Sequence, residues 1–408
     1  MNSASGRIEE AMGVNVLYLC HDLDDAAVWR RASMLSTGGA QVRMAGFRRG
    51  ERPLPGDAIV LGRTIDARLG QRAVTVLQTV LSLRYHLAGE AKPDVILARN
   101  LEMLVLARAA RRIWRGSGPA IAYEVLDIHR LMAGNGFKAR MMRGIERQMM
   151  RGTALVLTSS PAFVVNYFAK YGQSRAPIRI VENRYFEPGA PLRPESIPEA
   201  EVTVQATDAI AIGWFGILRC SESLACLDAF TRARPGRYVV HLRGKPALDA
   251  LPHFHEIVAA NPDFKFHGPY RYPEDLPSMY RAVDFAWLLD CYDAGLNSAW
   301  LLPNRLYEGC RFGAVPIAQA GTATAAYIQA RGLGITVESA AAPSVEAVLG
   351  ELGPDQLESL RAQVRAVDPT LWTATADDCV ELVDSLRPGV IAPGTWAHHD
   401  SLQDITNS

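Results

Sequence analysis

Residues 301–318 read LLPNRLYEGCRFGAVPIA and decide the fold. A Pro-Asn turn opens this segment, and the amphipathic stretch after it predicts a short helix that ends at Gly313. The apolar run 315–318 then predicts a buried strand. A helix, a glycine turn and a buried strand in this order are typical of an α/β sheet with parallel strands.

The predicted helix of this segment begins with polar and charged residues that suit an anionic ligand. A helix N-terminus attracts negative charge, so the backbone amides and Arg305 are predicted to bind a diphosphate. Glu308, in the first turns, would accept hydrogen bonds from ribose hydroxyls. The alternative is an ordinary helix–turn–strand unit with a surface glutamate.

Strands and helices alternate along the rest of the chain. Strands are predicted at 14–19, 41–45, 58–61, 94–98, 120–125, 154–158, 209–215, 237–242, 264–267, 284–288 and 314–318. Helices are predicted at 25–37, 70–88, 100–114, 137–151, 161–170, 221–232, 248–260, 274–282, 304–312 and 374–386. This alternation indicates an α/β fold with two doubly wound parallel sheets, whose ligands bind at the carboxyl ends of the strands.

A chain of 408 residues is long enough for two domains. The Pro-rich stretch 188–207 is the predicted linker. It separates an N-terminal Rossmann-like domain, 1–187, from a C-terminal one, 208–386, whose last helix is expected to pack back on the first domain. Residues 387–408 are expected to form a flexible tail.

Composition and motifs exclude several classes of protein. No apolar run approaches the roughly 18 residues of a membrane span, and the N-terminus lacks the pattern of a secretory signal. Six scattered cysteines without a CxxC pair favour reduced thiols and a cytoplasmic protein. A dinucleotide-binding GxGxxG turn is missing after the strands at 14–19 and 209–215, and a Walker loop is missing as well.

Segment 303–318 resembles the donor-site signature of GT-B glycosyltransferases, especially the family-4-like enzymes of bacterial polysaccharide assembly. The ordered series 213–219, 241–244, 266–270 and 368–372 is similar to further segments of that family. The resemblance implies two facing Rossmann-like domains and a donor site in the second. It implies the following donor-binding residues: Gly216, Arg219, Arg243, Gly268, Tyr270, Pro303, Asn304, Arg305 and Glu308.

The chain departs from the family where the family commonly has a second glutamate, eight positions before the ribose-binding one. Trp300 occupies that position here. The nearest polar candidates for the sugar hydroxyls are Asp293 and Asn297. Arginines and a helix N-terminus would neutralise the leaving phosphate, so neither a cofactor nor a metal is expected.

Glycosyl transfer needs a group that positions or deprotonates the acceptor hydroxyl. The predicted central strand 120–125 ends in a polar cluster from which we rank Asp127 first, Glu124 second and His129 third as catalytic residues. Strand alternation argues against all of them serving together. The alternative is that one of them forms a structural ion pair with Arg130.

The formal net charge of zero hides an asymmetry between the two halves of the chain. Residues 1–190 hold 27 of the 43 Lys and Arg and 16 of the 43 Asp and Glu, a balance of +11, and residues 191–408 have a balance of −11. Segment 137–151 combines basic and apolar residues in a pattern that suits either an anionic membrane surface or a core helix with a solvated face. Nucleic acid is not expected as a partner.

We therefore expect a cytoplasmic glycosyltransferase, peripheral to the inner membrane. It would move a hexosyl unit from a UDP- or GDP-sugar to a lipid-linked or oligosaccharide acceptor. A nucleotide-sugar epimerase of the same fold and a non-catalytic nucleotide-sugar-binding subunit of a polysaccharide complex are the two alternatives.

Overall fold

The computed structural model describes residues 13–64, 69–114, 116–194 and 209–389. The chain forms two compact units. Unit 1 holds the residues up to Glu182, Phe186–Pro188 and the stretch that begins at Thr375, and unit 2 holds Asn183–Tyr185 and Gly189–Ala374. Part of the predicted linker, and the tail from residue 390, lie outside the described residues.

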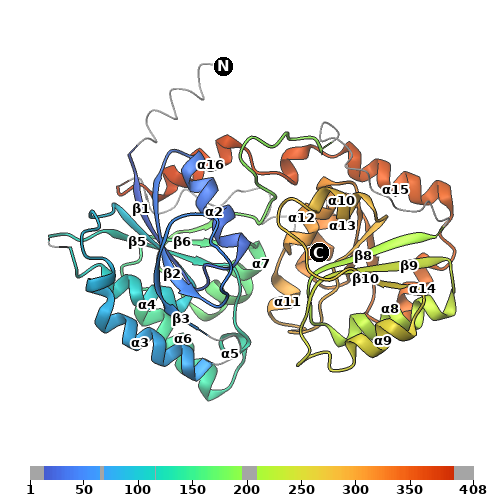
Figure 1. The fold of residues 1–408 in the computed structure, drawn as a ribbon, viewed down its shortest axis with the longest axis horizontal. Helices are drawn as coiled ribbons and strands as arrows, with labels where there is room; N and C mark the ends of the chain where they lie inside the picture. The colour runs from blue at the N-terminus through green and yellow to red at the C-terminus, as the bar shows by residue number, and fades with distance from the viewer. Residues whose placement is uncertain (1–12, 65–68, 115, 195–208, 390–408) are drawn as a thin grey trace. The chain divides into compact units, whose positions relative to one another are not determined.

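Unit 1 is built on a parallel sheet of seven strands (Figure 1). Its strands are β1 (Asn15–Cys20), β2 (Gln41–Arg48), β3 (Ala58–Arg63), β4 (Val95–Arg99), β5 (Ala120–Val125), β6 (Leu155–Thr158) and β7 (Ile178–Ile180). They pair in the order β3-β2-β1-β4-β5-β6-β7. β1, β4, β5 and β6 are almost wholly buried, as expected of strands that helices cover on both faces.

Helices cover both faces of the unit 1 sheet. They are α2 (Ala26–Thr37), α3 (Leu69–His86), α4 (Leu101–Ala110), α5 (Arg130–Ala133), α6 (Phe137–Met149), α7 (Pro161–Phe163), which runs into a π-helix (Val164–Ala169), and α16 (Ala376–Leu386). In Figure 1, α2 and α16 lie together on one face, and α3, α4 and α6 lie on the other. The last helix of the chain thus belongs to the first unit.

Unit 2 repeats this plan with a parallel sheet of six strands in the order β10-β9-β8-β11-β12-β13. The strands are β8 (Ile210–Leu218), β9 (Tyr238–Pro246), β10 (Phe264–Phe266), β11 (Phe285–Trp287), β12 (Val315–Gln319) and β13 (Ile335–Val337). Its helices are α8 (Ser221–Ala233), α9 (Phe254–Ala260), α10 (Leu276–Arg281), α11 (Asn297–Trp300), α12 (Asn304–Arg311), α13 (Ala323–Gln329), α14 (Ala342–Leu349) and α15 (Pro354–Ala366), followed by a 3-10 turn (Pro369–Leu371).

The predicted fold class is confirmed, with differences at the ends of some elements. The helix predicted at 248–260 begins only at Phe254, because Pro252 has no amide hydrogen to donate within a helix. The helix predicted at 100–114 ends at Ala110, and much of the one predicted at 161–170 is a π-helix. The strands β7 and β13 were not predicted, because three residues are too few to show the two-residue alternation of a strand.

Within the described residues, the structure contains no helix whose length and apolar character would let it cross a membrane.

Candidate functional site

Unit 2 reverses its strand order between β8 and β11, and doubly wound sheets bind ligands at such a point. Arg219 follows β8 and Asp290 follows β11, and Arg219 Nη2 donates to Asp290 Oδ2 at 2.8 Å. The ring of Tyr292 lies below the guanidinium, 4.8 Å from its carbon. Burial opposes ionisation of Asp290, but the charges of Arg219 and Arg305 outweigh it and hold the pKa of this carboxyl below its ordinary value. The predicted phosphate ligand Arg219 therefore stands at the point where the fold places a ligand.

Helix α12 forms as the sequence predicts, with Pro303 preceding it. Pro303 is extended and offers the helix no side-chain cap. Glu308 is only 3% exposed, and Tyr280 donates its hydroxyl to Glu308 Oε2 at 3.3 Å. Burial, together with the nearby charge of Glu308, raises the pKa of Tyr270. Tyr270 is thus near enough to Glu308 to respond to its charge, and the roles of both residues in donor binding stay predictions.

Two predicted donor-site arginines carry buried hydrogen-bond donors that no group in the described part of the chain satisfies. These donors are Nε of Arg243, on β9, and Nη1 of Arg305, in the first turn of α12. Buried polar atoms are nearly always hydrogen-bonded in folded proteins. Two charged donors in unit 2 without a hydrogen-bond partner among the described residues suit an anionic ligand such as a diphosphate.

Three glycines let the backbone pack closely beside Arg243. Gly216 and Gly244 have φ of 107° and 130°, values that favour glycine. A Cβ on Gly244 would lie 1.9 Å from the carbonyl oxygen of Gly216, so no side chain fits there. The amide of Gly244 donates to the carbonyl of Gly268 at 2.8 Å. The predicted glycines Gly216 and Gly268 therefore both contact Gly244, which belongs to the segment 241–244 that resembles the family.

The loop between β11 and α12 holds the residues predicted to contact the sugar. Asp293 donates its amide to Ser298 Oγ at 3.1 Å, and Asn297 begins α11 with only 5% of its surface exposed. Trp300 is likewise buried and supplies no carboxylate. Sugar binding by Asp293 and Asn297 stays a prediction.

Sequence reasoning missed Asp290 and Tyr280, the partners of Arg219 and Glu308. Asp290 had a signal, because it lies two residues after a predicted strand, where parallel sheets place functional side chains. Tyr280 had none, because it lies on a different helix from the carboxylate that it contacts.

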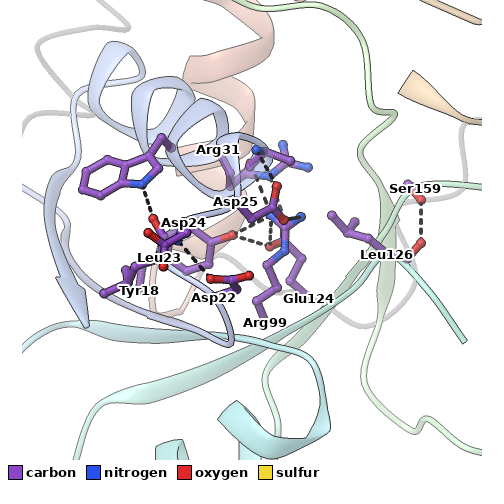
Figure 2. A network of polar contacts seen from close by, with 12 residues as sticks. Tyr18, Asp22, Leu23, Asp24, Asp25, Arg31, Arg99, Glu124, Leu126 and Ser159 are labelled. Carbon is purple, nitrogen blue, oxygen red and sulfur yellow. Dashed lines mark hydrogen bonds and ion pairs between the residues drawn. The ribbon is translucent and has the colours of Figure 1, made fainter. Parts of the chain in front are cut away.

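In unit 1, the structure places Glu124 inside a buried ion-pair network (Figure 2). Glu124 is 0% exposed and accepts hydrogen bonds from Arg31 Nε at 2.7 Å and from the Tyr18 hydroxyl at 2.6 Å, while Arg99 Nη1 lies 3.6 Å away. Burial works against ionisation, yet Arg31 and Arg99 lower the pKa of Glu124 below its ordinary value. Glu124 therefore forms a structural ion pair, the alternative to a catalytic role. Its partners are Arg31 and Arg99, and not Arg130 as expected. This environment argues against a catalytic role for Glu124.

Asp127 and His129 lie in the loop that follows β5, and both are exposed. His129 Nδ1 accepts the amide of Leu131 at 3.2 Å and caps the short helix α5. Asp127 leaves the sheet with its carboxylate at the surface, two residues after the strand ends. Of the three predicted acid–base groups, Asp127 is thus the one whose environment suits the role, which stays a prediction.

Two further residues at the carboxyl edge of this sheet escaped sequence reasoning. His21 follows β1, and its Nδ1 is buried without a hydrogen-bond partner among the described residues. Burial and then the charge of Arg99 lower the pKa of His21 to about 3, so its imidazole is neutral at physiological pH. Asn100 follows β4 with φ 74°, ψ 167°, a conformation that side chains rarely adopt and that clusters at functional sites. Neither feature has a signal in a single sequence.

Unit 2 also contains a cavity of about 460 Å³ away from these residues. Its wall includes five arginines: Arg193, Arg281, Arg311, Arg361 and Arg365. Arg311 donates to the carbonyls of Leu192 and Pro191, and Arg281 to that of Pro194. Arg281 and Arg311 thus hold residues 191–194 against the rest of unit 2, which is a structural role.

The described residues contain no group of three or more His, Cys, Asp and Glu side chains placed to hold a metal ion. Independence from metals stays a prediction.

The fold and the site together define a glycosyltransferase of the GT-B class. The chain is similar to the succinoglycan biosynthesis protein ExoL of Rhizobium meliloti (strain 1021), with 43% identity over 377 residues that cover 91% of this chain and 93% of ExoL. The chain belongs to the family of that protein. No family model matches the chain.

Solved structures share the fold at low identity. HepE of Anabaena, in complex with UDP and glucose, superimposes with a TM-score of 0.62 at 14% identity, covering 91% of this chain and 98% of its own. Sucrose-phosphate synthase of Thermosynechococcus elongatus superimposes with a TM-score of 0.65 at 14% identity, covering 92% and 99%. The lipopolysaccharide glycosyltransferase WaaG gives 0.56 at 14% identity, covering 92% and 96%.

Proposed function

We propose that this glycosyltransferase moves a hexosyl unit from a UDP- or GDP-sugar to a lipid-linked saccharide, on the cytoplasmic side of the inner membrane. Support comes from the relative ExoL, a succinoglycan biosynthesis protein, and from HepE, whose structures contain UDP and glucose or UDP-glucose. The observation that carries the donor half is the pair of buried, unsatisfied arginine donors on Arg243 and Arg305.

In this proposal the donor's diphosphate binds the guanidinium groups and the first-turn amides of α12. Arg219 exchanges Asp290 for a phosphate oxygen, and Glu308 accepts the ribose hydroxyls. These cations stabilise the charge that develops on the departing diphosphate, so transfer is expected to persist in EDTA.

Replacement of Glu308 tests the donor site. Glu308→Gln should weaken binding of UDP or GDP by about 1.5–3 kcal/mol, because hydrogen bonds to a charged acceptor contribute that much. Titration calorimetry with nucleoside diphosphates measures the loss. Tyr280→Phe is the matched control, because it removes one hydrogen-bond donor to Glu308 and leaves the carboxylate.

The two variants separate binding from stability. We expect Tyr280→Phe to lower the melting temperature while nucleotide affinity stays near that of the wild type. Unchanged affinity in a folded Glu308→Gln variant would remove Glu308 from the donor site. Nucleotide binding by the wild type without consumption of any nucleotide sugar would favour the non-catalytic subunit.

The acceptor half of the proposal rests on exposed apolar stripes of unit 1. On α6, Phe137, Met141 and Ile145 follow one another at helical spacing and are 73%, 49% and 42% exposed. On α3, a second stripe consists of Val74, Leu77, Leu81 and Tyr85, which are 54–81% exposed. Helix α4 contacts both α3 and α6, so the two stripes belong to one side of the unit (Figure 1).

Exposed large apolar side chains of this number mark an interaction surface. The exposed Lys138 and Arg140 flank the α6 stripe, and residues 1–190, which supply most of unit 1, have a charge balance of +11. Apolar side chains beside basic ones suit an anionic bilayer, where a lipid-linked acceptor is located. Arg143 does not take part, because it is buried and donates to the carbonyls of Met132 and Gly134.

A further inference from the structure

Two cysteines from different loops meet at the carboxyl edge of the unit 2 sheet. Cys220 immediately precedes α8, and Cys291 lies in the loop after β11. Cys220 Sγ accepts the amide of Ser223 at 3.3 Å and the amide of Cys291 at 3.2 Å. The sulfur of Cys220 therefore occupies the N-terminus of α8, where negative charge is stabilised.

The side chain of Cys291 has its own hydrogen-bond partner. The Cys291 thiol donates to Gln319 Oε1 at 3.3 Å, while the Cys291 amide donates to Cys220 Sγ. Cys220 is nearly inaccessible, whereas Cys291 is partly exposed, so the pair is reached from the side of Cys291. All six cysteines of the chain are free thiols.

The environment prepares Cys220 as a nucleophile. Interaction with the Cys291 side chain, aided by the hydrogen bonds from the Ser223 and Cys291 amides, lowers the pKa of Cys220 to about 7 against the opposing effect of burial. The same interaction raises the pKa of Cys291. Burial raises the pKa of Cys226 and Cys310. A thiolate is the reactive form of cysteine, so Cys220 differs in reactivity from those two thiols.

We propose that Cys220 and Cys291 form an oxidisable dithiol, which hydrogen peroxide converts into a disulfide. The Cys220 thiolate attacks one oxygen of peroxide, and the O–O bond breaks. Hydroxide departs, and Cys220 becomes a sulfenic acid. The Cys291 sulfur then attacks the sulfur of that sulfenic acid and loses its proton. The hydroxide that leaves Cys220 takes the proton of Cys291, and the hydroxide from the first step takes the proton that Cys220 released on ionising. The two sulfurs thus lose two electrons and one peroxide becomes two water molecules.

The geometry favours this bond over others. Disulfide-bonded cysteines have Cα atoms about 4.4–6.8 Å apart. The amide nitrogen of Cys291, one bond from its Cα, already lies 3.2 Å from Cys220 Sγ. In a reducing compartment a disulfide of this kind is transient and senses oxidants.

The disulfide would also act on the donor site, a consequence that rests on the proposed function. Arg219 and Asp290 are the chain neighbours of Cys220 and Cys291, and they form their own ion pair. A covalent bond between the cysteines holds the two loops together and stabilises that ion pair. Because Arg219 must exchange Asp290 for phosphate, the oxidised protein should bind nucleoside diphosphate more weakly.

Peptide mapping of the full-length protein tests the proposal. Reduced protein is treated with hydrogen peroxide, alkylated and digested with trypsin, which releases peptides 220–232 and 282–305. We expect these two peptides to be joined in a form that dithiothreitol separates. Cys226 shares the first peptide, so the Cys226→Ala variant should keep the cross-link, whereas Cys220→Ala and Cys291→Ala should lose it.

Peroxide-treated wild type without this cross-link, or with peptide 220–232 joined elsewhere, would overturn the proposal without any variant. A cross-link that leaves UDP and GDP affinity unchanged would overturn its effect on Arg219. Should reduced protein bind neither nucleotide, the proposed donor function fails, while the mapped disulfide stands by itself.

Discussion

At the scale of single residues, similar side chains have opposite roles in this protein. Glu124 and Asp127 lie three positions apart at the end of one strand, yet one is fully buried and the other exposed. Glu124 compensates the charges of Arg31 and Arg99 inside the sheet. Asp127 lies in the loop after β5 and is exposed, as the predicted contact with an acceptor hydroxyl requires.

Substitution of these two carboxylates distinguishes the roles. Asp127→Asn should lower transfer roughly 100-fold or more, the scale of lost acid–base assistance. Glu124→Gln should instead cost about 3–5 kcal/mol of unfolding free energy, because it leaves two buried guanidinium groups without their carboxylate. Turnover assays and denaturant melts of both variants supply the comparison. Normal turnover in Asp127→Asn would exclude it as the base.

The sequence alone could assign neither the structural role of Glu124 nor the exposed position of Asp127. Period-two alternation along 120–125 places side chains on one face of the strand or the other, but in this sheet both faces are buried. What separates Glu124 from Asp127 is the position at which the strand ends and the presence of Arg31, 93 residues away in the chain.

At the scale of elements, α6 shows how an amphipathic helix divides its residues. Its inward face buries Arg143 and Glu146, and Glu146 accepts hydrogen bonds from Tyr123 at 2.9 Å and from Gln173 at 2.6 Å. Its outward face carries the apolar stripe and Lys138 and Arg140. The sequence predicted the helix and its basic character, but it did not show that Arg143 and Glu146 are buried while Phe137, Met141 and Ile145 are exposed.

Vesicle sedimentation tests the outward face of α6. Lys138→Gln with Arg140→Gln should weaken binding to phosphatidylglycerol vesicles by about 1 kcal/mol per charge at low salt. Phe137→Ser with Met141→Ser should remove the binding that persists at high salt. Val348→Ser, an exposed apolar residue of unit 2, is the control. Wild-type protein that ignores phosphatidylglycerol vesicles even at low salt would contradict the membrane proposal.

At the scale of the whole molecule, the chain builds unit 1, then unit 2, and returns to complete unit 1 with α16. Five apolar or sulfur-containing residues of α16 are buried: Cys379, Val380, Leu382, Val383 and Leu386. Gly38 makes this packing possible, because a Cβ there would lie 2.2 Å from the carbonyl oxygen of Cys379. Arg179 adds an ion pair to Glu381 at 3.1 Å.

Truncation measures how much α16 contributes to the stability of unit 1. Deletion after Ala374 should destabilise unit 1 by several kcal/mol, because each buried Val or Leu side chain contributes about 1.5–3 kcal/mol. Deletion after Gly389 is the control, and it should leave the melting temperature unchanged if the tail is as flexible as its sequence predicts. Differential scanning calorimetry reports both. Equal melting curves for the two truncations would show that α16 is dispensable.

The sequence by itself determined the alternation of strands and helices, the two doubly wound units and the segment 303–318 with Glu308 on its helix. These features are local, because hydrophobic period, helix ends and glycine turns depend on near neighbours in the chain. Only the tertiary structure decided the pairs Arg219–Asp290 and Cys220–Cys291, each joining residues 71 positions apart, and the burial of Glu124. Strand order brings such residues together, and that order follows from packing across the whole sheet, which no short stretch of sequence records.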